Sequence, residues 1–482
     1  MKCALVSTFG GTRVSGSLGC SNIFEPIGLL YLAAWIKNRC HAEVRVIQQY
    51  DMDESQLVDS ILSEEPELVG FTTLAVTIKS VLRLAASVKE RAPGTVIVLG
   101  GEHATAVPEL ASKPQVDYVV RNEGEYPLAA LIEFLEGTCP LSQVPSVSYY
   151  QNGIIHNPAS GEKVDFDTLP FPERDELLLQ KCRVGGLMHP YMSKQRNVAV
   201  LTASRGCPND CLFCTNALMW NRELRLRTPA RVADEMQALY EALGTNTVFF
   251  ADLSFNTSPK YTVALCEEIA ARRLPVHWYA MCNLHLMRSD TVSAMADAGC
   301  RKIGFGLESI IPDGMRKAKK SISLTFEETN RLLDLVNSHG IFSKAYFIIG
   351  FPWDTRQALH RMTESLAELE AHEIRVGYYV PFQGTRGHEQ HKDIIGDWNL
   401  DHWSCLDRPI VRNPDMSMED ISSMRQQMYR SFYDSRSWFQ RVDTMAHRFP
   451  HLQDSIASFL EKDAANHLLT TANCYRAKPC PI

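Results

Sequence analysis

The sequence lacks a hydrophobic run long enough to cross a membrane. A helix that spans a bilayer needs about 20 consecutive apolar residues, whereas the best apolar runs here, such as residues 95–99 and 346–349, are no longer than single strands. The apolar run within residues 1–7 is also too short for a secretory signal peptide. We therefore expect no membrane partner and a cytoplasmic location.

An excess of positive charge is also absent. The chain has 49 Lys and Arg residues against 56 Asp and Glu residues, which gives a formal net charge of −7. Proteins that bind nucleic acids over a broad surface are usually strongly basic. We therefore expect no nucleic-acid partner, and the negative balance is compatible with a cationic small-molecule substrate.

Cysteine is too sparse for a disulfide scaffold, and internal repeats and low-complexity tracts are missing. The chain has 14 cysteines among 482 residues, whereas disulfide scaffolds are short chains dense in cysteine. A length of 482 residues exceeds what one hydrophobic core supports, so we expect two or three domains. Reduced cysteines in a chain of this size are free to bind metals.

Three of the cysteines are closely spaced in one loop. Cys207, Cys211 and Cys214 form a C-x3-C-x2-C pattern just after the apolar residues 198–201, which predict a strand. Thiolates favour iron–sulfur clusters, and three protein ligands leave one metal of a cubane cluster open to another molecule. A zinc site would need a fourth ligand nearby, but no Cys or His follows until Cys266. Buried structural cysteines would not explain the spacing.

Residues 1–140 alternate short apolar runs with helical patterns. Strands that are apolar throughout and separated by helices predict a doubly wound parallel sheet covered on both faces. Ligands bind such sheets beyond the carboxyl ends of the strands. Two glycine-bearing turns follow predicted strands at this edge, at residues 100–105 and 122–125. The predicted strands cover residues 3–6, 43–47, 68–71, 96–99 and 117–120.

Residues 191–400 alternate strands and helices again, and six βα units predict a partial (β/α)6 barrel. Barrel enzymes keep their chemistry just past the carboxyl ends of the strands. Asp252, Glu308 and Ser309 stand at such positions. The turn after Pro381 is interpreted as a solvent-exposed loop, and a substrate-facing role of Arg386, His388 and His391 is the alternative. The predicted strands cover residues 198–201, 247–251, 276–280, 302–306, 343–349 and 375–380.

Two further regions complete the domain organisation. Residues 141–190 break into turns and polar residues with several prolines, and we interpret them as a connector between domains. Residues 401–482 are predicted to be mainly helical, with an N-terminal cap at Ser417. Cys474 and Cys480 are too isolated to predict a second metal site. One helix has an apolar stripe at Ile421, Met424, Met428 and Phe432.

The cysteine loop resembles that of the radical S-adenosylmethionine (SAM) superfamily, because Arg205-Gly206-Cys207-Pro208 and the aromatic Phe213 also match. The resemblance implies a [4Fe-4S] cluster on Cys207, Cys211 and Cys214 whose open iron takes the amino and carboxylate groups of SAM. It also implies reductive cleavage of SAM to a radical that abstracts hydrogen from an unactivated carbon. The SAM contacts implied by the resemblance are Phe213, Asp252, Glu308, Ser309 and Gly350.

The first domain resembles the cobalamin-binding domain that precedes the barrel in one large branch of this superfamily. The resemblance rests on Pro26-x-Gly28-Leu29 and on the two glycine-bearing turns. The Asp-x-His-x-x-Gly motif that supplies a lower histidine ligand in other cobalamin proteins is absent, so a corrin would bind base-off; a degenerate domain without corrin is the alternative. The cobalamin contacts implied by the resemblance are Gly100, Gly101, His103, Glu123 and Gly124.

The resemblance leaves several functions open. Cobalamin-dependent methylation of an unactivated carbon in a natural-product or lipid pathway is the leading prediction. Radical dehydration of an aminoglycoside sugar diol without cobalamin is the alternative, and a non-catalytic cobalamin or redox sensor is a third reading. Each enzymatic function implies a small, cationic or sugar-like substrate and an external electron donor such as flavodoxin, ferredoxin or a dedicated reductase. The sequence identifies no catalytic acid or base.

Overall fold

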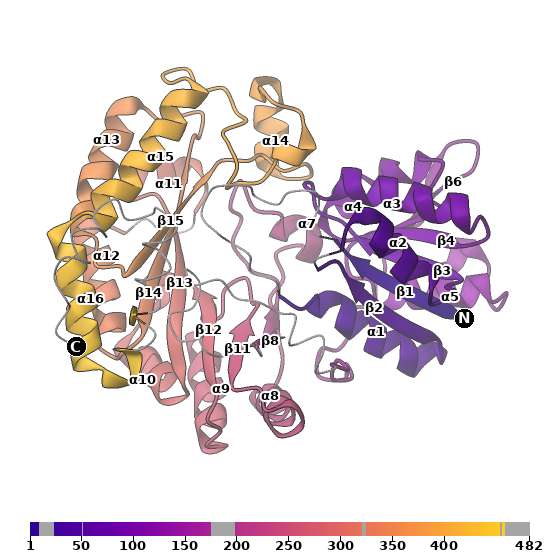
Figure 1. The fold of residues 1–482 in the computed structure, drawn as a ribbon, viewed down its shortest axis with the longest axis horizontal. Coiled ribbons are helices and arrows are strands. Elements are labelled where there is room, and N and C mark those ends of the chain that lie inside the picture. Colours follow the sequence, from indigo (N-terminus) through magenta and orange to yellow (C-terminus); the bar gives the residue numbers. More distant parts are fainter. Residues whose placement is uncertain (9–23, 51, 175–197, 321–323, 454–455, 458–482) are drawn as a thin grey trace.

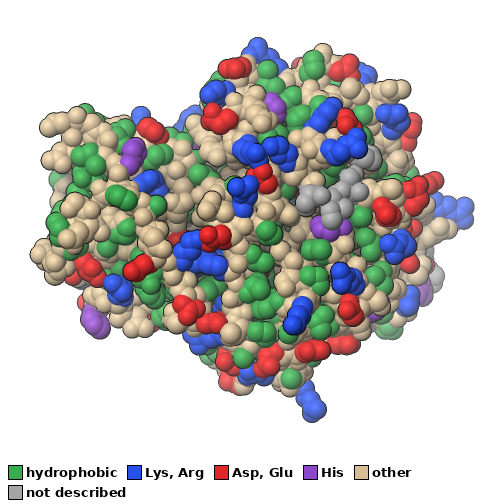
Figure 2. Space-filling model, turned by 180° about the vertical axis from the view of Figure 1, so that it is seen from behind, with side chains coloured by type: hydrophobic (Ala, Val, Ile, Leu, Met, Phe, Trp, Pro, Cys, Tyr) green, Lys and Arg blue, Asp and Glu red, His purple; other side chains and the backbone are tan. Residues whose placement is uncertain are grey.

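The computed structural model describes residues 1–8, 24–50, 52–174, 198–320, 324–453 and 456–457. These residues form two α/β lobes, an N-terminal lobe and a larger lobe to which the C-terminal helices belong (Figure 1). A notch separates the lobes at one edge of the molecule (Figure 2). Among the residues described, no helix combines the length and the apolarity that a bilayer crossing requires.

The N-terminal lobe is built on a seven-stranded sheet whose first five strands are parallel. Helices α1 (Ile27–Cys40) and α5 (Glu125–Leu135) pack on one face, and α2 (Glu54–Leu62) and α3 (Ile78–Arg91) on the other. The expected doubly wound fold is therefore confirmed. In spatial order the strands are β2 (Glu43–Gln48), β1 (Lys2–Ser7), β3 (Leu68–Thr72), β4 (Val96–Gly100), β5 (Tyr118–Val120), β6 (Val147–Tyr150) and β7 (Ile154–His156).

The last two strands of this sheet correct a prediction. Residues 141–190 were expected to form an irregular connector, but β6 pairs antiparallel with β5, and β7 pairs antiparallel with β6. The turn between them contains Asn152 and Gly153, which both have positive φ angles. Asn-Gly between apolar runs is a strong hairpin signal, so the sequence carried this information. The part of the predicted connector beyond residue 174 lies outside the described residues.

The larger lobe has six parallel strands, which confirms the partial (β/α)6 barrel. The strands are β15 (Glu373–Tyr378), β14 (Phe342–Ile349), β13 (Cys300–Glu308), β12 (His277–Cys282), β11 (Thr247–Phe250) and β8 (Val198–Leu201) in spatial order. Helices cover the outside of this sheet (Figure 1). They are α8 (Pro229–Leu243), α9 (Pro259–Ala271), α10 (Ser289–Asp297), α12 (Phe326–Asn337) and α13 (Arg356–Ser365).

The C-terminal helices α15 (Met418–Tyr433) and α16 (Arg436–Arg448) pack against the barrel. The predicted cap is confirmed, because the Ser417 hydroxyl accepts a hydrogen bond from the Asp420 backbone N–H and the Asp420 carboxylate accepts one from the Ser417 backbone N–H. All four residues of the predicted apolar stripe are buried, each side chain contributing about 1.5–3 kcal/mol. Cys474 and Cys480 lie outside the described residues.

Side chains from outside the barrel occupy both edges of its sheet. At the edge strand β8, the Val200 N–H donates to Glu25 Oε1 at 2.6 Å, and Arg174 Nη2 donates to the Val200 carbonyl at 2.7 Å. Arg174 and Glu25 also pair with each other, with Nε and Oε1 3.0 Å apart. At the other edge, the Val376 N–H donates to the Tyr429 hydroxyl at 2.9 Å and the Ile374 N–H to the Tyr433 hydroxyl at 3.2 Å. These contacts satisfy backbone groups that an open sheet would leave unpaired.

Candidate functional site

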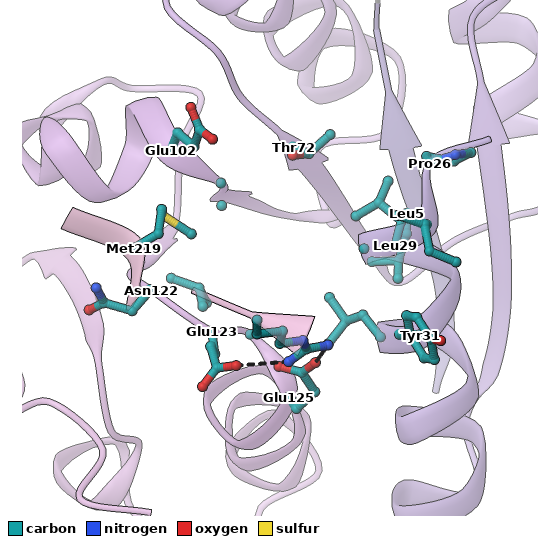
Figure 3. Close-up of a pocket in the computed structure, with 18 of the residues that line it drawn as sticks. Leu5, Pro26, Leu29, Tyr31, Thr72, Glu102, Asn122, Glu123, Glu125 and Met219 are labelled. Carbon is teal, nitrogen blue, oxygen red and sulfur yellow. Dashed lines mark hydrogen bonds and ion pairs between the residues drawn. The ribbon is translucent and has the colours of Figure 1, made fainter. Parts of the chain in front are cut away.

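A cavity of about 550 Å³ lies where the carboxyl ends of the two parallel sheets face each other. This position is where ligands bind both to open α/β sheets and to barrels. The N-terminal lobe contributes strand ends and the first turn of α1 to the lining, and the barrel contributes the chain on both sides of the cysteine loop. Figure 3 shows Glu123 and Glu125 at one end of the cavity and Glu102 and Thr72 at the other.

Three glycines keep the cavity wall of the N-terminal lobe open. A Cβ added at Gly28 would meet no atom within 4 Å, and one at Gly100 would meet only the Val120 carbonyl oxygen, at 3.8 Å. At Gly124 the nearest atom would be a Leu32 methyl carbon at 3.4 Å. A large flat ligand could therefore approach the backbone closely. The cavity and this cradle fit a corrin bound between the lobes.

Gly101 is glycine because of its backbone conformation and the packing of the neighbouring loop. Its φ angle is +92°, and a Cβ would lie 2.8 Å from Thr72 Oγ1 and 3.0 Å from the backbone nitrogen of Thr73. The neighbouring loop therefore requires glycine here, whether or not a ligand is bound. Gly101 lines the cavity, so a contact to cobalamin stays a prediction.

The structure does not support the predicted contact from His103. This residue is buried in the short helix α4 (Glu102–Ala106) and does not line the cavity. Burial lowers its pKa to about 4, so the imidazole is neutral at physiological pH. His103 belongs to the packing beneath the glycine turn, where its backbone N–H donates to the Thr73 carbonyl at 3.2 Å.

The turn between β5 and α5 joins the two lobes. Asn122 has a φ angle of 62°, a conformation that asparagine tolerates better than most residues. Its side-chain amide donates to the Leu218 carbonyl of the barrel lobe at 2.8 Å. Glu123 follows in the cavity wall and pairs with Arg205, their Oε1 and Nη1 atoms lying 2.8 Å apart.

The three cysteines share one partly buried space. Cys207 is buried, and Cys211 and Cys214 are partly exposed. Burial raises the pKa of Cys211 to about 12, with Cys214 and Cys207 adding to the effect and Lys320 opposing it. These thiols therefore ionise when a positively charged partner binds, which is the behaviour of metal ligands.

Their arrangement fits a cluster better than a single ion. Among the described residues, no group of three Cys, His, Asp or Glu side chains is placed to hold one metal ion. Sulfurs on one zinc ion would have to converge, because Zn–S bonds are about 2.3 Å long. Three thiols that bind three different irons surround a cubane and lie further apart than the ligands of one ion. Cluster binding by Cys207, Cys211 and Cys214 stays a prediction.

Glu308 stands at the end of β13, close to the cysteine loop. Its side chain is 11% exposed and its Oε1 accepts a hydrogen bond from Lys320 Nζ at 2.7 Å. Its charge raises the pKa of Cys211 and Cys214, which places the carboxylate beside the thiols. Lys320 was missed by the sequence analysis, since a lysine outside any strand end gives no signal of its own.

Ser309 lies next to Glu308 and shapes the following turn. Its Oγ accepts a hydrogen bond from the Ile311 backbone at 3.0 Å. Ser309, Lys320 and Asn283 line a second, small cavity of about 30 Å³. Glu308 does not line this cavity, and contacts from Glu308 and Ser309 to SAM stay predictions.

Asp252 has a structural use that the sequence did not reveal. Its carboxylate accepts hydrogen bonds from the Ala203 N–H at 3.0 Å and from the Ser204 hydroxyl, which immediately precede the cysteine loop. Burial raises the pKa of Asp252 to about 6, although these hydrogen bonds oppose the shift. Asp252 thus anchors the start of the loop, and its predicted contact to SAM has no support from this geometry.

Phe213 packs near the turn that begins at Gly350, and SAM contacts from both residues stay predictions. Gly350 has a φ angle of +85°, and its N–H donates to Asp354 Oδ2 at 2.8 Å, which the Phe351 N–H also reaches at 3.0 Å. The rings of Phe213 and Phe351 have centroids 6.2 Å apart. Asp354, which closes this turn, was missed because its partners are backbone groups.

The segment after Pro381 is not a simple exposed loop, which corrects another prediction. It forms α14 (Arg386–His391) and docks on the cysteine loop. The Gly387 N–H donates to the Leu212 carbonyl at 2.9 Å, and Arg386 pairs with Asp210. His391 faces Tyr379 rather than a cavity, with Nδ1 2.8 Å from the hydroxyl.

Comparison with known proteins gives two family matches in the same order as the lobes. Residues 20–132 match the model of the B12 binding domain, and residues 201–366 match that of the radical SAM superfamily. An uncharacterized methyltransferase of Pyrococcus horikoshii is 26% identical over 426 residues, covering 87% of this chain and 89% of the relative. An anaerobic magnesium-protoporphyrin IX monomethyl ester cyclase of Rubrivivax gelatinosus is 24% identical over 464 residues, covering 94% and 80%.

The fold is similar to that of a solved protein with the same cofactor set. The radical SAM methyltransferase TsrM of Kitasatospora setae, solved with cobalamin and a [4Fe-4S] cluster bound, superposes with a TM-score of 0.71. The two chains are 17% identical, and the match covers 96% of this chain and 99% of TsrM. At this identity the likeness concerns the arrangement of the two lobes.

Proposed function

Because the chain belongs to the radical SAM superfamily, in the branch with a B12 binding domain ahead of the barrel, we propose that it methylates an unactivated carbon of a small molecule. As a radical SAM enzyme it uses a [4Fe-4S] cluster, SAM and cobalamin. The observation that carries the proposal is the cavity between the lobes, whose walls come from the glycine turns on one side and the flanks of the cysteine loop on the other.

In this proposal, Cys207, Cys211 and Cys214 hold the cluster, and Glu308 receives the amino group of SAM. When bound, the reduced cluster and SAM supply a radical for hydrogen abstraction, and the corrin supplies the methyl group. Gly350 and Phe213 flank the adenine. Lys320 holds the Glu308 carboxylate beside the thiols through its 2.7 Å contact, which orients it before SAM arrives.

The cavity wall also limits water around the reacting carbon. Many of the lining side chains are aliphatic or aromatic, and the carboxylates Glu25, Glu123 and Glu125 are each neutralised by arginine. A largely apolar wall presents few groups that would react with a carbon radical. Aliphatic and aromatic lining residues include Leu5, Leu29, Tyr31, Leu32, Leu128, Met219 and Trp220.

A reaction without methyl transfer is the second candidate. The Rubrivivax gelatinosus cyclase covers 94% of this chain and is not named as a methyltransferase. The substrate radical left by hydrogen abstraction would then lose one electron to an external redox protein, and a proton, to give an oxidised product. On a sugar diol, it would instead lose water and take up one electron from the external donor, and a proton. The same cluster and SAM contacts would serve either outcome, and the corrin would have another role.

The experiment that separates these functions follows the methyl group. The reconstituted protein is incubated anaerobically with a reductant, a small-molecule extract and SAM that carries a deuterated methyl group, and products are read by mass spectrometry. A product with one labelled methyl supports the proposal. An oxidised or dehydrated product without label would contradict methyl transfer, and protein without cobalt after reconstitution would contradict the role of the corrin.

A further inference from the structure

The two cofactor sites share one wall. Thr202, Ser204, Arg205 and Gly206 lie directly upstream of Cys207 in the sequence, and all four line the cavity. Met219 and Trp220, in the helix that follows Cys214, line it as well. The chain that carries the cluster ligands therefore also forms the barrel side of the corrin cavity.

One ion cluster ties this wall to the N-terminal lobe. Arg205 Nη1 lies 2.8 Å from Glu123 Oε1, and Arg205 Nη2 lies 2.7 Å from Glu125 Oε1. The side chains of Arg205, Glu123 and Glu125 are 10%, 17% and 6% exposed. The guanidinium also lies 4.7 Å from the centroid of the Phe166 ring. Such a buried, doubly paired arginine fixes the distance between the two backbones that carry it.

The link from Arg205 to the cluster ligands is short and stiff. Gly206 has a φ angle of +83°, and any Cβ there would overlap the Glu223 carbonyl oxygen. Arg205 is held in strand β9 (Ser204–Arg205), which pairs with β10 (Arg225–Leu226). On the other side, the Asn216 amide donates to the Cys207 carbonyl at 2.6 Å. A change in the position of Cys207 is therefore transmitted to Arg205, two residues away.

From this geometry we infer that cluster assembly and corrin binding are thermodynamically coupled, and that the Glu123–Arg205–Glu125 cluster carries the coupling. The inference rests on the cofactors of the proposed function. Without the cluster, only protein contacts hold the cysteine loop. Corrin binding must then also order the shared wall, and this cost lowers the affinity for the corrin. With the cluster in place, the wall is already ordered. By linkage, each cofactor raises the affinity for the other by the same factor.

The test measures the affinity for hydroxocobalamin in the full chain with and without the cluster. Cluster-free protein is obtained as unreconstituted wild type and as the Cys207→Ala/Cys211→Ala/Cys214→Ala variant. We expect the Kd to be about tenfold higher without the cluster, within the usual range of coupling between sites. In Glu123→Gln and Glu125→Gln, the ratio of the two Kd values should fall to about two or less, because the neutral amides hold Arg205 more weakly.

Asp401→Asn is the matched control. Asp401 Oδ2 pairs with Lys79 Nζ at 3.1 Å, an ion pair between the two lobes whose residues do not line the cavity. Its substitution removes a contact between the lobes and should leave the ratio of the Kd values unchanged. Arg205→Lys, which keeps the charge and loses the double pairing, should give an intermediate ratio, and a circular dichroism spectrum of each variant checks that it folds.

Equal Kd values for wild type with and without the cluster would overturn the coupling and leave the proposed function intact. A ratio in Glu123→Gln and Glu125→Gln that equals the wild-type ratio would overturn the role of the ion cluster. A folded, cluster-loaded wild type that does not bind hydroxocobalamin would overturn the inference together with the role of the corrin in the proposed function.

Discussion

Glu308 ends strand β13 in a backbone conformation that few non-glycine residues adopt. Its φ angle is 62°, and the pairing register with β14 shifts between Gly306 and Glu308. Such strain persists only where the surroundings hold the residue, and it often marks a functional position. Here Lys320 contacts the carboxylate, which lies close enough to the cysteine loop to raise the pKa of Cys211 and Cys214. The strand could be predicted from its apolar residues, but the irregularity that aims Glu308 could not.

Replacing Glu308 with glutamine removes the charge and keeps the shape. We expect SAM affinity to fall by about tenfold to a hundredfold, because a charge-assisted hydrogen bond contributes roughly 1.5–3 kcal/mol. Equilibrium binding of SAM to the cluster-loaded protein measures this effect. Glu327→Gln, on the exposed first turn of α12, is the control. Unchanged SAM binding with loss of product would assign Glu308 to the substrate instead.

Asp354 makes stability depend on pH. Burial raises its pKa from 3.8 to about 7, although two backbone N–H groups oppose the shift. An acid whose pKa is raised by folding stabilises the protein most when it is protonated, so its contribution is complete below about pH 4 and is lost as the pH rises through about 7. In Asp354→Asn this loss is absent. The stability of Asp354→Asn relative to wild type should therefore increase from pH 4 to pH 7, as followed by Tm.

A Tm difference between Asp354→Asn and wild type that is constant across this range would show that Asp354 is ionised throughout in the folded protein.

Asp252 illustrates a limit of sequence reasoning. Its place after β11 predicted a SAM contact, but both of its oxygens accept hydrogen bonds from the start of the cysteine loop. A strand-end carboxylate can serve a ligand or the protein itself, and only the positions of its neighbours decide which.

At the scale of elements, the glycine turns of the N-terminal lobe could be predicted from the sequence, but the separate purpose of each glycine could not. Gly100 is open to the cavity, whereas Gly101 is packed against the loop that contains Thr72 and Thr73. The parallel strands were predicted well because they are apolar on both faces. The β6–β7 hairpin was missed because its strands are short and partly exposed, and the Asn-Gly turn was the remaining signal.

Gly100→Val should block the cavity while keeping the sheet. Gly100 is the last residue of β4, where valine is a good strand residue, and the added side chain would extend into open space beside Val120. We expect the affinity for hydroxocobalamin to fall by at least about tenfold, because a loss of about 1.4 kcal/mol of binding free energy has this effect. The iron content should stay unchanged. Gly94→Val is the control, because a Cβ there meets nothing within 4 Å and the residue is exposed.

Cobalamin binding by Gly100→Val at wild-type affinity would place the corrin elsewhere. Loss of iron and cobalamin together with a lower Tm would point to misfolding of the lobe instead of a blocked cavity. The two readouts separate a filled cavity from a damaged fold.

At the scale of the whole molecule, the lobes are joined by a buried ionic network. Arg174 pairs with Glu25 and with Glu235 at 3.0 and 3.2 Å, and Arg227 pairs with Glu235 at 2.7 Å. Burial raises the pKa of Glu25, and Arg174 opposes this shift. The domain order and the fold of each lobe could be predicted from sequence. The network could not, because it depends on how residues far apart in the chain meet.

Glu25→Ala should destabilise the protein strongly. Removing one partner of a buried pair costs about 3–5 kcal/mol, because the other charge is left unpaired, and the Val200 N–H loses its acceptor as well. Chemical denaturation measures the change in unfolding free energy. Glu43→Ala, exposed on β2, should change it by less than about 0.5 kcal/mol. A similar small effect for Glu25→Ala would show that the network contributes little to holding the lobes together.

The occupied edges of the barrel sheet have a consequence for protein engineering. Glu25 and Arg174 belong to chain segments outside the barrel, yet they occupy the hydrogen-bonding groups of β8 as a neighbouring strand would. A barrel fused to a different domain would have unpaired backbone groups on β8 unless the fusion kept both residues. Unpaired edge strands promote aggregation with other chains. A chimera should therefore not be cut at the domain boundary that the family matches suggest.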